Sequence, residues 1–131
     1  MAVDIVIEVE NKPGELAKVA AAVSDAGVNL AAATFTGNGD AAQLHILVKH
    51  AEPVRHALAI THADVRPVER EVVVVDLDDN PGSLSDLARQ IADAGVNIDT
   101  IYVATNNRVV FHSADMDGLR KALRGHEAHL H

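Results

Sequence analysis

The sequence predicts an α+β protein built from two similar units, each with the order strand, helix, strand, strand, helix, strand. A segment with Pro-Gly, an apolar helical run and the letters DAGVN occurs at residues 11–30 and again at 79–98. The residues before the first segment alternate between apolar and polar, as in a half-buried strand, and those before the second segment are rich in valine. A duplicated unit of roughly 65 residues is typical of a repeat, and we place the two domains at residues 1–69 and 70–131.

In the first unit, the alternation from Val3 to Val9 predicts a strand with one buried face. Pro13 and Gly14 end it, because proline lacks an N–H and glycine adopts backbone angles closed to other residues. A helix is expected next, since apolar residues recur at the spacing of one helical face: Leu16, Val19, Ala20 and Val23. Gly27 is expected to end this helix.

The remainder of the first unit is predicted as a hairpin, a helix and a short strand. Strands are expected at residues 28–35 and 43–48, on either side of the turn letters TGNGD at 36–40. A helix begins at about Glu52, since proline is tolerated in a first helical turn, and a strand near residues 65–68 closes the unit. Ala31 to Ala33 suggest room beside the second strand.

The second unit repeats this order. Its expected elements are a strand at 71–77, a helix at 83–94, a strand at 96–104, a tight turn at Asn106-Asn107, a strand at 108–112 and a helix at 115–124. Ser83 and Asp86 have the spacing of a helix capping box. The sequence stops where the last strand should run, so this strand is expected to be short or completed by another unit.

The predicted plan of each unit is ferredoxin-like, with an antiparallel sheet covered by both helices on one side. The other face of the sheet carries no helix. In EVVVVDL at 71–77, apolar residues occupy both faces of the expected strand. We therefore expect the helix-free face or the sheet edge to be covered by the other repeat or by another chain.

Composition excludes several classes of function. Hydrophobic residues make up 48% and charged residues 23%, as in a globular protein, and the formal net charge is -8. The 11 Lys and Arg residues form no basic run and aromatic residues are only 2%, so nucleic acid is not an expected partner. An acidic surface is repelled by anionic lipid, and no apolar run reaches the ~20 residues of a membrane span.

A cytoplasmic location is expected. The first residues carry Asp4, Glu8 and Glu10 where a signal peptide needs an apolar segment. The sequence contains 0 Cys, so it can form neither a disulfide framework nor a thiolate metal site. This composition suits a reducing compartment.

Neither catalysis nor a bound metal or cofactor is expected. The letters HEAHLH at 126–131 miss the HExxH metal spacing by one residue, and TGNGD lacks the Gly-Lys-Ser/Thr of a phosphate loop. The serines have no convincing base or carboxylate partner: Ser24, Ser83, Ser85 and Ser113.

The repeated loop has chemistry that suits a free amino acid. The positive end of the helix that follows Pro-Gly favours a carboxylate. Polar side chains that can accept from an ammonium group lie in or near this loop: Asn11, Asp79 and Asn80, with Asn29 and Asn97 after the far end of each helix. The alternative is structural, because Asn and Asp beside Pro-Gly are common turn and capping residues.

The segments NKPGELAKVAAAVSDAGVNL and DNPGSLSDLARQIADAGVNI resemble the first half of the ACT domain, and the whole chain resembles a tandem pair of such domains. The resemblance implies a ferredoxin-like fold and a ligand at an interface between two ACT domains. It assigns ligand binding to matched positions in the two copies: Asn11, Gly14 and Asn29, then Asp79, Gly82 and Asn97. Some serine-sensing members carry His where this chain has Val9 and Leu77, so serine specificity does not follow.

The leading hypothesis is a regulatory protein that senses a free amino acid between ACT-like units, works as a homodimer and signals to a metabolic enzyme. The alternative is an assembly module or regulatory subunit that docks an enzyme without a small ligand of its own. In either case, function lies in the response of the partner, since a differential affinity between states is all that regulation requires.

Overall fold

A computed structural model describes residues 2–61 and 67–128 of the 131. The chain divides into two compact units, one formed by Val3–Arg70 and the other beginning at Glu71. The first unit contains β1 (Val3–Glu10), α1 (Glu15–Asp25), β2 (Ala32–Asn38), β3 (Ala41–Val48), α2 (Glu52–Thr61) and most of β4 (Val68–Glu71). The second contains β5 (Val73–Asp76), α3 (Ser83–Asp93), β6 (Thr100–Ala104), β7 (Arg108–His112) and α4 (Met116–Ala122).

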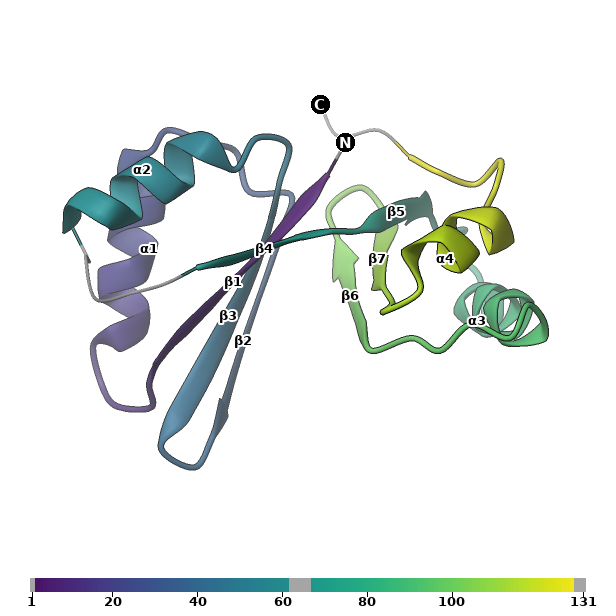
Figure 1. Ribbon diagram of the computed structural model, residues 1–131, viewed down its shortest axis with the longest axis horizontal. Helices are drawn as coiled ribbons and strands as arrows, with labels where there is room; N and C mark the ends of the chain where they lie inside the picture. The colour runs from purple at the N-terminus through teal and green to yellow at the C-terminus, as the bar shows by residue number, and fades with distance from the viewer. Residues whose placement is uncertain (1, 62–66, 129–131) are drawn as a thin grey trace. The chain divides into compact units, whose positions relative to one another are not determined.

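The first unit is a sheet of order β2-β3-β1-β4 with both helices on one face (Figure 1). Strand β3 pairs antiparallel with β1 and with β2, and Ile46 lies opposite both Ile5 and Ala33. The core joins alternate strand residues to the inner faces of α1 and α2, and its fully buried members include Ile5, Ile7, Val19, Ile46, Val54 and Leu58. The strand order and the one-sided helices confirm the predicted ferredoxin-like fold.

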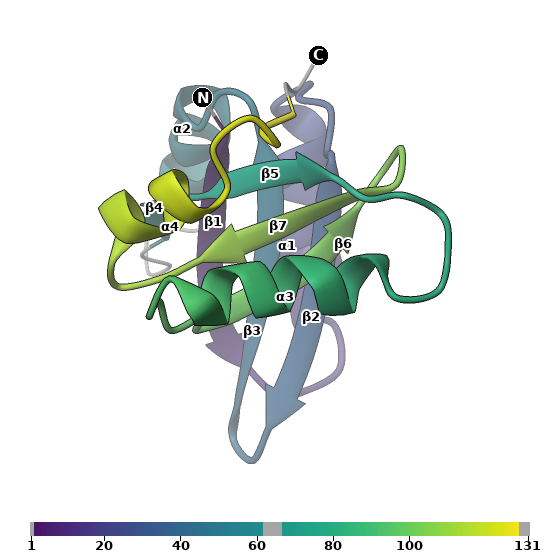
Figure 2. The same cartoon turned by 90° about the vertical axis from the view of Figure 1, so that its right-hand side faces the viewer.

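The second unit repeats this plan with a smaller sheet of order β5-β7-β6, and Figure 2 shows α3 and α4 together on one face of it. Its core includes Val73, Val75, Ile91, Val109, Phe111, Leu119 and Leu123. The expected last strand is reduced to one antiparallel bridge between Val75 and Glu127, and the Ala128 N–H donates to the Val74 carbonyl oxygen at 2.6 Å. Within residues 67–128, this bridge takes the place that β4 holds in the first unit.

The predicted strands at 28–35 and 96–104 begin too early, because β2 starts at Ala32 and β6 at Thr100. The apolar residues just after each helix pack into the core instead of joining the sheet. Val28 packs against the first core, and Val96 is buried in the second with its N–H donating to the Ile91 carbonyl. Apolar character there signals burial of the helix-to-strand connection.

The predicted five-residue turn at 36–40 is also wrong. Thr36, Gly37 and Asn38 pair with β3, which leaves Gly39 and Asp40 as the turn. These polar residues are tolerated in a strand because β2 lies at the sheet edge and they are exposed. The tight turn at Asn106-Asn107 is confirmed: both residues have positive φ, 60° and 53°, and residues 105–107 connect the paired Ala104 and Arg108.

The capping box at Ser83 and Asp86 is not formed. Gly82 occupies the cap position and provides no side chain, while the Ser83 hydroxyl donates to Asn80 Oδ1 at 2.7 Å. Three other boundaries differ: β4 spans Val68–Glu71, β5 spans Val73–Asp76 and α4 spans Met116–Ala122. Residues 65 and 66 of the strand predicted at 65–68 lie outside the described residues.

Candidate functional site

The two repeated loops have the same backbone geometry. Gly14 has φ 90° and ψ −15°, and Gly82 has φ 93° and ψ −13°, both in the left-handed region. The hydrogen bonds match as well. The Lys12 N–H donates to the Glu10 carbonyl at 3.0 Å, and the Asn80 N–H donates to the Asp78 carbonyl at 2.9 Å. A left-handed residue favours glycine, so the repeated Pro-Gly encodes one backbone shape twice.

Each glycine leaves open space at the start of its helix. A Cβ placed on Gly14 or Gly82 would meet nothing within 4 Å. Neither helix has a side chain that caps its first N–H groups. Because the first N–H groups of a helix have no partner within the helix, both loops present donors and the positive end of a helix dipole to an anion.

The polar side chains of the loops have different roles in the two copies. Asn11 Nδ2 donates to the Gly39 carbonyl at 2.9 Å, which holds the first loop against the β2–β3 hairpin. A Cβ on Gly37 would lie 2.8 Å from the Asn11 amide, so this contact needs glycine there. Its counterpart Asp79 is exposed, whereas Asn80 accepts from Ser83. Asn11 and Asn80 therefore support the loops, and Asp79 is open to solvent.

A lysine distinguishes the first loop. Lys12 Nζ lies 2.9 Å from Glu10 Oε2 and 3.7 Å from Glu15 Oε1, at the position that Asn80 holds in the second copy. The hydrogen bond with Glu10, followed by the charges of Glu10 and Glu15, raises the pKa of Lys12 above its usual value. Lys12 therefore stays cationic at neutral pH beside the helix start.

Asn29 and Asn97 lie at the other end of the helices from the loops. Helix α1 has 11 residues and is therefore about 16 Å long, so Gly14 and Asn29 of one unit cannot both touch one free amino acid. Both asparagines are exposed. Ser113 Oγ donates to the Asn97 carbonyl at 2.5 Å, which anchors the backbone there and leaves the side chain outward.

An apolar cavity, which we call the α1–β2 cavity, lies beside β2 of the first unit, where Ala31 to Ala33 suggest room. Sequence reasoning did not predict its lining or its volume. The cavity has a volume of about 320 Å³. Its lining comes from α1, the α1–β2 connection, β2 and β3: Leu16, Ala20, Val23, Ser24, Val28, Leu30, Ala33, Leu44 and Ile46. Leu16 and Ala20, predicted to face the core, line this cavity instead and are exposed. The available signal was the small side chain of Ala33.

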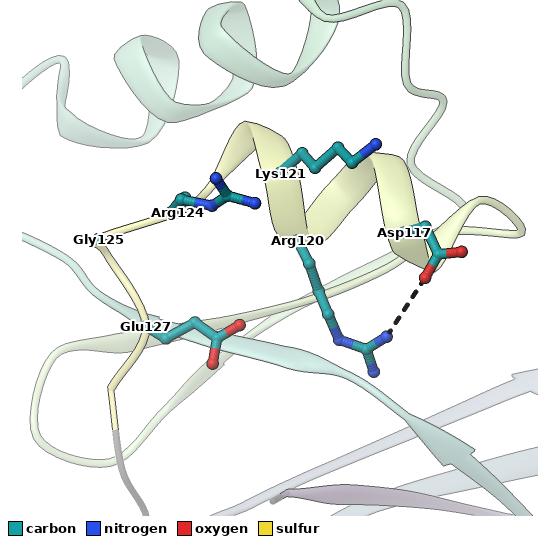
Figure 3. A pocket seen from close by; sticks show the side chains of 6 residues that line it. All are labelled: Asp117, Arg120, Lys121, Arg124, Gly125 and Glu127. Carbon is teal, nitrogen blue, oxygen red and sulfur yellow. Dashed lines mark ion pairs between the residues drawn. The ribbon is translucent and has the colours of Figure 1, made fainter.

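A larger hollow of about 580 Å³ lies beside α4, lined by Asp117, Arg120, Lys121, Arg124, Gly125 and Glu127. Figure 3 shows long charged side chains of both signs around it. Arg120 is engaged by Glu71 at 2.5 Å and by Asp117 at 3.9 Å. No residue of the repeated loops lines this hollow, so we do not include it in the candidate site.

Residues 2–61 and 67–128 contain no group of three or more side chains that could hold a metal ion. His129 and His131 of the tail motif lie outside the described residues. Among the described helices, none is both long and apolar enough to cross a bilayer.

Known proteins resemble this chain over most of its length. Protein BT0572 from Bacteroides thetaiotaomicron is 26% identical with a TM-score of 0.83, over 93% of this chain and 85% of that chain. The regulatory subunits of aspartate kinase from Thermus thermophilus and Thermus flavus are 21% and 22% identical, with TM-scores of 0.66 and 0.65. Each alignment covers 93% of this chain, and 89% and 90% of those chains. A search of curated proteins gave no match.

The sequence matches the family described as ACT domain pair over residues 1–123. The match includes both repeated loops and all four helices. It agrees with the two ferredoxin-like units and with the fold of the regulatory subunits above. The chain belongs to the family of ACT domain pairs.

Proposed function

We propose that this protein is a non-catalytic regulatory protein that binds a free amino acid at the repeated loops. The observation that carries the proposal is the identical left-handed geometry of Gly14 and Gly82, each opening a helix start to solvent. The α-carboxylate is placed at the helix start and the ammonium group near an asparagine or aspartate oxygen. Asp79, Asn29 and Asn97 have exposed side chains for the second role.

The site is proposed to be composite, at an interface between two ACT units. Since Gly14 and Asn29 lie at opposite ends of α1, a loop needs the asparagine of another unit to complete it. Antiparallel association of two units along their edge strands brings the loop of one to the asparagine of the other. A homodimer with such an interface is therefore the proposed assembly.

Exposed apolar side chains on the edge strands support this association. Strands β2 and β6 each lie at the edge of a sheet. Phe35 is 38% exposed on β2, while Ile101 and Val103 are 45% and 64% exposed on β6. Contiguous exposed apolar residues beside a free strand edge mark an interaction surface.

Regulation follows from linkage. A ligand held by two units stabilises their association, and the amino acid and the partner then alter each other's affinity by the same factor. Similarity to regulatory subunits of aspartate kinase supports a metabolic enzyme as the partner. We place this interaction in the cytoplasm, where a chain with 0 Cys needs no oxidising environment.

A thermal-shift screen against the twenty amino acids tests the proposal. At a ligand concentration 100 times Kd, linkage predicts about 2.7 kcal/mol of stabilisation, which raises Tm by several degrees. The double variant Asn29→Ala/Asn97→Ala should abolish the rise while Tm without ligand stays unchanged, since both side chains are exposed. A flat screen of the folded protein contradicts ligand binding.

The second candidate function is an assembly module without a small ligand, favoured by the exposed apolar edge of β6. Asparagine variants separate the two functions better than Gly82→Val, because any side chain at Gly82 strains a φ of 93°. Under the assembly function, the double variant Asn29→Ala/Asn97→Ala retains partner binding and no amino acid changes it. Under the sensor function, the same variant removes the response to the amino acid.

A further inference from the structure

The α1–β2 cavity of the first unit defines the class of ligand. We propose that it receives the side chain of an aliphatic α-amino acid, such as leucine, isoleucine or valine. This inference rests on the proposed amino-acid site and names its substrate class. It also assigns the ligand to the first unit, where Gly14 and Asn29 lie, and not equally to both.

The lining selects an apolar side chain. Eight of its residues are Leu, Ile, Val or Ala, and Ser24 supplies the single hydroxyl. A charged or amide side chain would lose its hydration there and find no matching partner, which disfavours its binding. A volume of about 320 Å³ is at the small end of ligand pockets, so the cavity suits one small molecule and excludes a dinucleotide.

The position of the cavity connects it to the polar part of the candidate site. Val28 and Leu30 both line it, and Asn29 lies between them in the chain. Asn29 is exposed, as is 42% of Leu30. A ligand whose ammonium or carboxylate group contacts Asn29 can therefore direct its side chain between α1 and β2. Burial of the partly exposed Leu30 on binding adds a hydrophobic contribution.

The second unit carries larger side chains at two equivalent positions. The cross-strand pair Ala33 and Ile46 of the first unit corresponds to Ile101 and Phe111 in the second, by equivalent pairing of β2–β3 and β6–β7. Both second-unit side chains are larger. Phe111 is 1% exposed and belongs to the second core, so it takes up volume that Ile46 leaves open. We therefore expect these larger side chains to fill the equivalent space in the second unit.

Isothermal titration calorimetry of the full chain tests the inference, with L-leucine, L-isoleucine and L-valine against L-serine, L-aspartate and L-lysine. The aliphatic set should bind at least tenfold more tightly than the polar set. Ala33→Ile, which installs the second-unit residue, should weaken aliphatic binding at least tenfold. Ala88→Leu, which enlarges an exposed side chain on α3 at the second-unit position equivalent to Ala20, is the matched control and should change Kd less than twofold.

The outcomes separate this inference from the proposed function. Preferential binding of a polar amino acid overturns the aliphatic class and leaves the sensor function standing, whereas no binding of any amino acid overturns the sensor function itself. Undiminished leucine binding by Ala33→Ile shows that the cavity is not occupied. Ala20→Leu fills it from the exposed side of α1 and provides the same test if Ala33→Ile does not fold.

Discussion

The loops of the two units share one backbone conformation at their glycines, but the units differ beside the first helix of each. Gly14 and Gly82 agree within a few degrees, yet α1 lies over an open apolar cavity while the equivalent strands of the second unit carry Ile101 and Phe111. Loop geometry depends on two or three local residues, whereas cavity volume depends on side chains from four segments. Duplication followed by divergence can therefore keep a loop conformation in both units while the side chains beside it change.

A second difference lies on the helix-free face of each sheet. In the first unit, Asp4 accepts from Arg70 Nη2 at 2.7 Å and lies 3.2 Å from His45 Nδ1. The positions equivalent to Asp4 and His45 are Val72 and Val110 in the second unit. The helix-free face of the first unit therefore contains an ion pair, whereas that of the second unit is apolar. Substitutions should change electrostatic interactions on the first face and hydrophobic packing on the second.

The largest expected effect comes from comparing the equivalent core residues. Phe111→Ala should lower the free energy of unfolding by about 3–5 kcal/mol, because it removes the largest fully buried side chain. Ile46→Ala should cost less, about 2–3 kcal/mol, since the first unit already has a cavity beside it. Urea unfolding of each variant measures the difference. Equal losses would mean that the two cores are packed alike.

The next largest effect concerns the charged face. Asp4→Asn should cost about 1–3 kcal/mol, since Asp4 is 0% exposed and its loss of charge leaves Arg70 without its carboxylate. Glu8→Gln, on the same strand but exposed, is the matched control and should stay within about 0.5 kcal/mol. Chemical denaturation measures both. An Asp4→Asn variant as stable as the control would show that the ion pair contributes nothing.

The two loop glycines test whether the repeated loops have the same backbone geometry. Gly14→Ala and Gly82→Ala should each cost about 1–2 kcal/mol, because both hold left-handed angles and neither new methyl group meets a neighbour. Thermal unfolding of the two variants should show matching losses. A loss at one position alone would contradict the shared loop geometry.

The smallest effect is pH-dependent and limited to the first unit. Arg55 donates two hydrogen bonds to Glu69, at 2.6 Å and 2.7 Å, and this hydrogen bonding lowers the pKa of the Glu69 carboxyl. A lowered folded pKa means that the pair stabilises the fold above the ordinary glutamate pKa of about 4.3 and loses that contribution as pH falls through the lowered value. Stability curves of wild type and Glu69→Gln should therefore converge as pH falls through the lowered pKa of Glu69. Curves that stay parallel into acid would rule the pair out.

Local chemistry explains which elements were predictable from sequence. The predicted helices at 83–94 and from Glu52 agree closely with α3 and α2, because apolar spacing and Pro-Gly signals depend on a few neighbouring residues. The start of β2 was misplaced because Val28 is apolar for a tertiary reason, its packing under the helix end. Ser83 and Asp86 match a capping-box pattern, but Gly82 occupies the cap position. The Ser83 hydroxyl donates to the Asn80 side chain instead.

The sequence by itself determined the duplication, the ferredoxin-like order of elements and the repeated left-handed glycines, since these depend on periodicity and on residues adjacent in the chain. Only the tertiary structure decided that Asn11 supports the hairpin, that Gly14 and Asn29 lie at opposite ends of α1, and that an apolar cavity opens beside Ala33. Each of these depends on distances between segments far apart in sequence. Such distances follow from side-chain volumes packed together, which a linear pattern does not contain.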